Sequence, residues 1–204
     1  MSTTISLIIS SLGVLGFALV VVKVYQLYVV RKQNQKQLAM EISEVLKTGS
    51  LQEALSFCNK KEDSVTVRVA KAGITESMAG GDKNTIQDKM DSILVAETNK
   101  NEKSLGWLAL IANLATLTGL VGTILGLIHA FSGIKTVDAE LKAKILSEGI
   151  SLAANATAYG LLVAVPLLIA YAILNNRAAV LNDDMNKAGL NIFIQLAYKV
   201  DPRN

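Results

Sequence analysis

Three long stretches without a charged side chain dominate the pattern of this sequence. The first runs from Ile5 to Val22, and its apolar character continues after Lys23 to Val30. The other two cover residues 104–133 and 149–176. A helix needs about 20 residues to cross about 30 Å of hydrocarbon, so each stretch is long enough to span a membrane. A buried helix of a soluble bundle would normally carry a polar stripe, which all three stretches lack. The pattern therefore predicts three membrane-spanning helices.

The polar segments have the periodicity of helices. In residues 31–103, one helical face carries Leu38, Ile42 and Val45, and Gly49 is placed to end that helix. After the third span, apolar residues again recur at helical spacing and are expected to pack against the other polar helices: Leu181, Met185, Ala188 and Ile192.

Local signals divide residues 31–103 further. Ser50 and Glu53 fit the S-x-x-E capping box, and Cys58 would lie on the inner face of that helix as a small buried hydrophobe. Residues 79–82 have the composition of a turn. Beyond the turn a helical period continues toward the second span without Pro or Gly, which predicts one long helix across the membrane boundary.

The distribution of Lys and Arg predicts the orientation. Residues 31–103 hold twelve basic residues, including Arg31 and Lys32 directly after the first span, whereas none precedes that span. Lys23, in the first span, is expected to snorkel toward the cytoplasmic headgroups. The remaining basic residues lie in the second loop and the tail, and they are Lys135, Lys142, Lys144, Arg177, Lys187, Lys199 and Arg203. The N-terminus is therefore expected outside, and the large loop and the C-terminus in the cytoplasm.

These observations predict an all-α membrane protein with long helices that extend into the cytoplasm. Its parts are a first transmembrane helix (1–30), a cytoplasmic helical loop (31–103), a second transmembrane helix (104–133), a periplasmic loop (134–148), a third transmembrane helix (149–176) and a cytoplasmic helical tail (177–204).

Composition agrees with a membrane protein. Hydrophobic residues make up 51% of the 204 residues, charged residues 18%, and the mean hydropathy is +0.39. A net charge of +3 with mixed signs gives no basis for nucleic-acid binding. With one His and one Cys, the chain cannot build a zinc site or a disulfide framework. No nucleophile–base set or phosphate-binding loop is present, so we expect neither an enzyme nor a bound cofactor.

Small residues line the second and third spans, as in helices that approach each other closely in lipid. In the second span they are Gly119, Gly122 and Gly126. In the third, one narrow face carries small groups and a single hydroxyl: Ala153, Thr157, Gly160 and Ala164. Pro166 follows and leaves the carbonyl of Leu162 without its usual donor, which favours a kink. Tight helix packing explains these residues, and a functional role for the glycines is the alternative.

Polar groups in the spans suggest an ion path. Thr116 and Thr123 share a face of the second span, and Thr157 lies at similar depth in the third, near Asn155. A threonine in a helix can bond to its own backbone, so each alone has a structural explanation, but together they can line a polar path. No Asp or Glu lies inside a span, and His129 is near the outer end of the second, where an interfacial role is the usual one.

Two sequence signatures then resemble a known family. They are ATLTGLVGTILG (residues 115–126) with Ala130-Phe131 after it, and GIS (149–151), ATAYGL (156–161), VAVP (163–166) and Tyr171 in the third span. Both are similar to the MotA/TolQ/ExbB proton-channel family, and the three-span layout fits it over nearly the whole chain.

The resemblance implies a pentameric ring of this subunit in the bacterial inner membrane. Its pore would hold the single spans of two copies of an ExbD- or TolR-like partner, whose membrane Asp carries the ion and supplies the missing carboxylate. A TonB- or TolA-like transducer is a further expected partner, together with membrane lipid. Thr123 and Thr157 match the family's pore threonines.

Two positions depart from the family pattern. Thr116 stands where ExbB and TolQ commonly have Pro, and Leu152 stands where they commonly have a Glu five residues before the third-span threonine. The neutral oxygens of Thr116 and Asn155 suit a hard cation as well as a proton relay, so the expected ion is a proton, with sodium as the alternative.

Two other classes of membrane protein compete with this interpretation. A passive oligomeric scaffold would explain the small-residue faces, although it does not need threonines at matching depth on two spans. A self-contained channel or transporter would normally carry its own charged or broken-helix site, which these spans lack.

Overall fold

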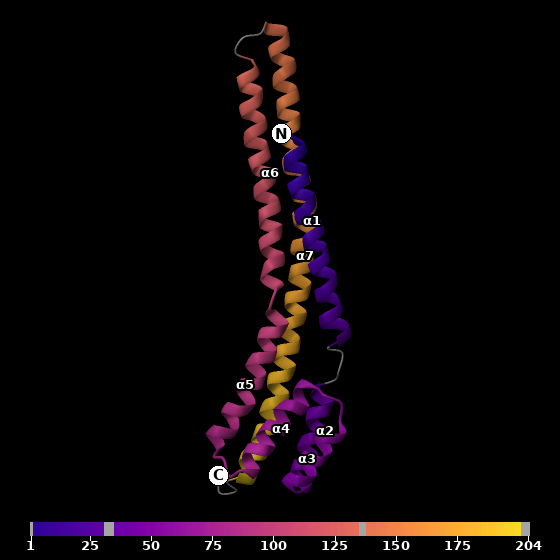
Figure 1. Ribbon diagram of the computed structural model, residues 1–204, viewed down its shortest axis with the longest axis vertical. Helices are drawn as coiled ribbons and strands as arrows, with labels where there is room; N and C mark the ends of the chain where they lie inside the picture. The colour runs from indigo at the N-terminus through magenta and orange to yellow at the C-terminus, as the bar shows by residue number, and fades with distance from the viewer. Residues whose placement is uncertain (1, 31–34, 135–137, 201–204) are drawn as a thin grey trace. The chain divides into compact units, whose positions relative to one another are not determined.

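The computed structural model describes residues 2–30, 35–134 and 138–200, and every regular element in these ranges is a helix (Figure 1). The elements are α1 (Ser2–Val24), the π-helix η1 (Tyr25–Val30), α2 (Gln35–Thr48), α3 (Leu51–Lys60), α4 (Val65–Met78), α5 (Lys83–Glu102), α6 (Leu105–Gly133) and α7 (Ala139–Val200). Three helical stretches are long and apolar enough to cross a membrane, and they lie within Thr4–Tyr28, Lys83–Gly133 and Leu141–Val200. The all-α prediction with three spans is confirmed.

The chain forms two compact units. The spanning unit consists of the chain up to Gln26 together with Ser104–Asn175. The polar unit consists of Leu27–Lys103 together with the chain from Asn176 onward. Helix α7 contributes residues to both, and the two units are described separately.

The core of the polar unit is built from α2 to α5 and the C-terminal part of α7. Helices α4 and α5 pack against each other, and the fully buried side chains between these elements include Ile42, Leu46, Val67, Ile74, Ile86, Ile192 and Leu196. Met185, Ala188 and Ile192 belong to this core and Leu181 is buried as well. The predicted packing of the tail against the other polar helices is confirmed.

Helix ends in the polar unit follow their local sequence signals. The capping box is present, because the Glu53 N–H donates to the Ser50 hydroxyl at 3.2 Å and the Ser50 N–H donates to the Glu53 carboxylate at 3.1 Å. Asp82 caps α5 by accepting from the Thr85 N–H at 2.9 Å. The predicted turn at 79–82 is also present, with Gly80 at φ 84°.

Cys58 lies fully buried in this core, as predicted. Burial raises the pKa of its thiol, and the nearby positive charge of Lys71 offsets this only in part. A buried thiol with a raised pKa is a poor nucleophile.

Two polar clusters, each centred on buried side chains, contact the C-terminal end of α5 in the polar unit. The carboxylate of Glu97, only 3% exposed, pairs with Arg68 of α4 at 3.1 Å and Lys100 at 2.7 Å. The Asn101 amide donates to the Asn182 side-chain carbonyl at 2.7 Å, and the Asn182 amide donates to Glu102 at 2.9 Å. Buried polar groups of this kind fix register because an unpaired one is costly.

The prediction of one long helix across the membrane boundary is wrong. Helix α5 ends at Glu102, α6 begins at Leu105, and Ser104 between them has φ 72° in the left-handed region. A left-handed residue after the last helical turn ends a helix, but glycine is its usual carrier. The hydrophobic period continues across Ser104, so the pattern alone does not reveal the break.

One further expectation needs correction, and part of the second loop has helical structure. Residues 139–148, which lie in the expected periplasmic loop, are helical because α7 begins at Ala139. This stretch lacks Gly and Pro and is rich in helix formers. Lys23 does not snorkel, because its side chain is only 4% exposed and lies within the protein. Four basic residues used to predict the orientation lie outside the described residues: Arg31, Lys32, Lys135 and Arg203.

In the spanning unit, α1 packs along α6. A small core joins the three spans, with buried Ala112, Ala115, Ala164 and Leu167 and the α1 residue Leu12 against them. The outer side of α1 is exposed and apolar, with Leu7, Val14 and Phe17 each 68–71% exposed. Such a surface suits hydrocarbon rather than water.

Candidate functional site

The helices α6 and α7 cross where both backbones carry glycine. A Cβ placed on Gly119 would lie 3.0 Å from the carbonyl oxygen of Ala156 and 3.3 Å from the Cα of Gly160. A Cβ placed on Gly160 would lie 2.8 Å from the carbonyl oxygen of Ala115. Backbone therefore contacts backbone here, and the absence of side chains is what permits the approach.

The contact continues on both sides of this crossing. Gly126 lies against Ala153, where an added Cβ would come within 3.0 Å of the alanine Cβ. Gly122 lies against Ala156 and also against Ile5 of α1, at 2.6 and 3.4 Å from an added Cβ. The small residues thus bring all three spans together.

Thr157 bonds across this interface. Its hydroxyl donates to the backbone carbonyl of Gly119 on α6, with an oxygen–oxygen distance of 3.3 Å, and its side chain is half-buried. The Gly119 carbonyl is within reach because neither glycine at the crossing has a side chain.

The other two candidate threonines bond within their own helix. The Thr123 hydroxyl donates to the Leu120 carbonyl at 2.6 Å, and the Thr116 hydroxyl donates to the Ala112 carbonyl at 3.2 Å. Both side chains are half-buried. Thr123 and Thr157 are therefore both held by backbone carbonyls of α6, but only Thr157 does so from the neighbouring helix.

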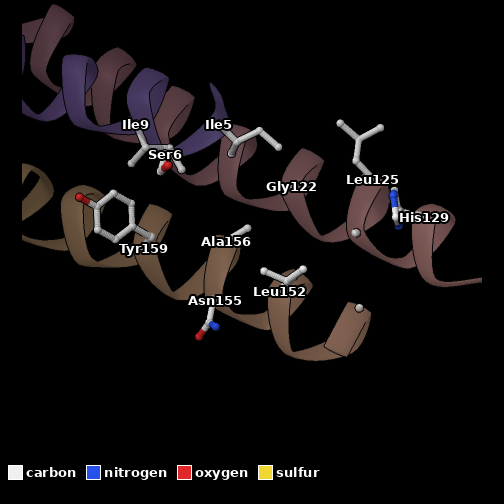
Figure 2. A pocket seen from close by; sticks show the side chains of 12 residues that line it. Ile5, Ser6, Ile9, Gly122, Leu125, His129, Leu152, Asn155, Ala156 and Tyr159 are labelled. Carbon is white, nitrogen blue, oxygen red and sulfur yellow. The ribbon is translucent and has the colours of Figure 1, made fainter. Parts of the chain in front are cut away.

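A cavity of about 420 Å³ lies among α1, α6 and α7 (Figure 2). Its walls are mainly apolar and include Ile5, Leu125, Leu152 and Ala156, and the polar residues at its edge are Ser6, His129, Asn155 and Tyr159. Asn155 is exposed, and Figure 2 shows its side chain pointing away from α6, while Leu152 and Ala156 point toward it. The predicted ion-path residue Asn155 is therefore not gathered with Thr157 at the helix crossing.

The contribution of α1 to this region was not foreseen from the sequence. The Tyr159 hydroxyl lies 3.3 Å from the Ser10 hydroxyl, and Ser10 also donates to the Ser6 carbonyl at 2.7 Å. Ser6 and Ser10 are one helical turn apart in a highly apolar helix. This spacing places both hydroxyls on one face of α1, which is the sequence signal for a polar contact with another span.

Pro166 lies inside α7, which continues through it without a break. Leu162, whose carbonyl has no proline N–H to accept from, is 71% exposed at its side chain. Within the described residues, no three His, Cys, Asp or Glu side chains gather closely enough to hold a metal ion.

Three curated proteins are similar to this chain in sequence. A protein of Methanothermobacter thermautotrophicus named as a homolog of biopolymer transport protein ExbB is 25% identical over 186 residues, which cover 91% of this chain and 63% of that protein. The biopolymer transport protein ExbB of Pseudomonas putida is 26% identical over 82% of this chain and 52% of its own length. The Tol-Pal system protein TolQ of Pseudomonas aeruginosa is 32% identical over 55% of this chain and 52% of its own length.

The chain thus spans between half and two thirds of the length of these relatives. The profile of the MotA/TolQ/ExbB proton channel family matches residues 61–187, which include α6, the helix crossing and most of α7. The relatives named above are ExbB and TolQ proteins. The chain is therefore an ExbB/TolQ-like member of the MotA/TolQ/ExbB proton channel family.

Proposed function

We propose that this chain is the ring-forming subunit of an ion-driven motor in the inner membrane. Five copies surround a pore that holds the spans of an ExbD- or TolR-like partner, and ion flow is coupled to work on a periplasmic or outer-membrane machine. The machine serves energised transport, envelope maintenance or motility, through a TonB- or TolA-like transducer. The large loop and the C-terminus face the cytoplasm in this arrangement.

The observation that carries the proposal is the hydrogen bond of Thr157. A threonine hydroxyl has one proton to donate and two lone pairs to accept with. The proton of Thr157 is given to the Gly119 carbonyl, so its oxygen presents only lone pairs to anything else. It can then accept a hydrogen bond from a protonated carboxyl group or bind a cation, but it offers no proton to a carboxylate.

This polarity suits a partner's Asp that is neutralised at the level of Thr157. The sequence of the three spans contains no Asp or Glu of its own, which agrees with an ion carrier supplied by a second protein. Neutralising one Asp at a time would release one contact between a partner span and the ring at a time. The mismatch between five subunits and two partner spans favours stepwise rotation of the partner spans inside the ring. Each elementary charge that crosses 100 mV releases about 2.3 kcal/mol.

An apolar stripe in the polar unit supports assembly with further copies. Leu190, Ile194 and Tyr198 follow one another at i, i+4 and i+8 on α7 and are 57%, 50% and 62% exposed. They lie beyond the charge-free residues 149–176, in the tail that this proposal places in the cytoplasm. Exposed apolar patches outside a membrane usually mark protein interfaces.

The first experiment compares Thr157→Val with Thr157→Ser in the complex with the neighbouring single-span protein. The valine keeps the shape and removes the hydroxyl, whereas serine keeps the hydroxyl. We expect Thr157→Val to reduce ion-driven work by at least tenfold and Thr157→Ser to retain most of it. Thr118→Val is the matched control, because the Thr118 hydroxyl donates to the Leu114 carbonyl of its own helix at 2.7 Å.

Native mass measurement of the same complex tests the assembly. Five copies with two partner chains agree with the proposal. A homo-oligomer that never binds a partner, or a Thr157→Val complex that works at the wild-type rate, contradicts it. The first of these results would favour a passive scaffold, which the close backbone crossing of α6 and α7 also suits.

A further inference from the structure

The cavity among α1, α6 and α7 has no role in the proposed motor. Its volume of about 420 Å³ corresponds to roughly 14 waters at the liquid's share of about 30 Å³ each. A buried water needs two to four polar partners, so the lining decides what fills this space.

The polar groups at its edge are mostly engaged or turned away. The Tyr159 hydroxyl lies 3.3 Å from the Ser10 hydroxyl, and Asn155 points away from α6 (Figure 2). Ser6 has a partner of its own. His129 remains, and one imidazole cannot order water throughout a space of this size.

The rest of the lining is hydrocarbon or glycine, with Ile5, Leu125, Leu152 and Ala156 along the walls. Leu152 adds a hydrocarbon side chain from α7 to this lining. Its side chain is 53% exposed, so the cavity is open to the surface of the spanning unit beside Leu152. An empty space of this size would forfeit packing contacts along its whole lining.

We propose that this cavity binds one acyl chain of a membrane phospholipid. The chain enters beside Leu152 and lies against Ile5 of α1 and Leu125 of α6, with the polar head of the lipid toward His129. The occupant is drawn from the surrounding bilayer, because the spanning unit lies in hydrocarbon and its cavity is apolar. This inference does not depend on the ion, the partner protein or the machine.

The test uses the assembled complex in vesicles of phosphatidylethanolamine and phosphatidylglycerol that contain a phospholipid with a photoactivatable diazirine on its acyl chain. Crosslinks are mapped by peptide mass spectrometry. We expect crosslinks at Ile5 and Leu125, measured relative to those at Leu7, which is 69% exposed on the outside of α1 and reports the general lipid contact.

The variant Leu152→Trp fills the cavity and is expected to lower the Ile5 and Leu125 crosslinks at least tenfold relative to Leu7. Leu162→Trp is the matched control, since Leu162 lies on the same helix, is 71% exposed and does not line the cavity. It is expected to leave the ratio unchanged. Equal ratios in the two variants, or no crosslinks at Ile5 and Leu125 in the wild type, overturn the proposal.

A Leu152→Cys variant identifies the rival occupants without relying on a large side chain. A lipid-filled cavity protects this cysteine from a membrane-impermeant anionic thiosulfonate. Rapid modification would show a water-filled cavity. A disulfide formed between two copies on addition of the oxidant copper phenanthroline would show that the cavity mouths of two subunits face each other instead of lipid. Either result overturns the proposal, and neither bears on whether Thr157 is required for ion-driven work.

Discussion

Replacing Gly160 by alanine is expected to force α6 and α7 apart. An added Cβ would lie 2.8 Å from the Ala115 carbonyl oxygen and 3.1 Å from the Gly119 Cα. Both are backbone atoms, so no side chain can rotate away to make room. Optimal carbon–carbon separations are about 3.5–4.0 Å, so the helices must separate by roughly 0.5–1 Å.

Three terms set the expected magnitude. Overpacking of this kind costs about 1–3 kcal/mol, and the Thr157 hydrogen bond to the displaced Gly119 carbonyl is worth about 0.5–1.5 kcal/mol. The higher helix propensity of alanine returns about 1 kcal/mol. Gly160→Ala should therefore destabilise the packing of the spans by about 0.5–3.5 kcal/mol.

Gly106→Ala is the control for helix propensity. Among the described residues, no atom outside the backbone of its own helical turns and its chain neighbours lies within 4 Å of a Cβ added to Gly106 in α6. This variant should therefore be as stable as the wild type or up to about 1 kcal/mol more stable. Stability is measured by denaturant unfolding of the detergent-purified complex. If Gly160→Ala proves as stable as Gly106→Ala, the backbone contact at the crossing does not limit the approach of the helices.

Three further outcomes are expected in the polar unit. Hydrogen bonds from Thr85 lower the pKa of Asp82. The stabilising contribution of the Asp82 carboxylate is therefore complete above about pH 5 and disappears as the pH falls through the lowered pKa. Asp82→Asn should remove this part of the acid dependence of unfolding, and an unchanged pH profile would contradict it. The buried Cys58 thiol, whose pKa is raised by burial, should resist maleimide at pH 7 until denaturant is added, and labelling at the rate of a free thiol would refute its burial. Asn101→Ala leaves the Asn182 carbonyl unsatisfied and should cost about 1–3 kcal/mol in denaturant unfolding; a loss below about 0.5 kcal/mol would mean that water replaces the amide.

Elements with a local chemical signal could be predicted from the sequence. The capping box at Ser50 and Glu53 is satisfied by residues three positions apart, so it forms wherever its helix forms. The inward face of the α7 tail follows from spacing alone, because Met185, Ala188 and Ile192 must share a side of the helix.

Features that depend on contacts between distant segments could not be predicted in the same way. Ser104 takes a left-handed conformation although it is not glycine. The hydrophobic period continues past it, so the sequence pattern does not predict the break between α5 and α6. Lys23 was expected at the headgroups because a lysine near a helix end usually snorkels, but the fold buries it.

The candidate threonines illustrate the same limit. Spacing places Thr116 and Thr123 on one helical face, but it does not predict which carbonyl accepts the hydrogen bond from each hydroxyl. In the structure both hydroxyls donate to carbonyls of their own helix. The Thr157 hydroxyl donates to the Gly119 carbonyl of the neighbouring helix, because the facing glycines bring that carbonyl within reach. Asn155, only two residues away from Thr157, points away from α6.

The crossing of α6 and α7 therefore ties packing to the proposed ion path. The same Gly119 carbonyl that the close approach exposes to α7 takes the proton of Thr157 and fixes the direction of its hydroxyl. Gly160→Ala disturbs both the approach and the hydroxyl, while Thr157→Val removes the hydroxyl and leaves both glycines in place. If ion-driven work is lost in Thr157→Val while the stability of the spans falls by less than in Gly160→Ala, the loss comes from the missing oxygen rather than from loosened helices. If instead activity follows stability across the two variants, the hydroxyl serves packing and the path of the ion lies elsewhere.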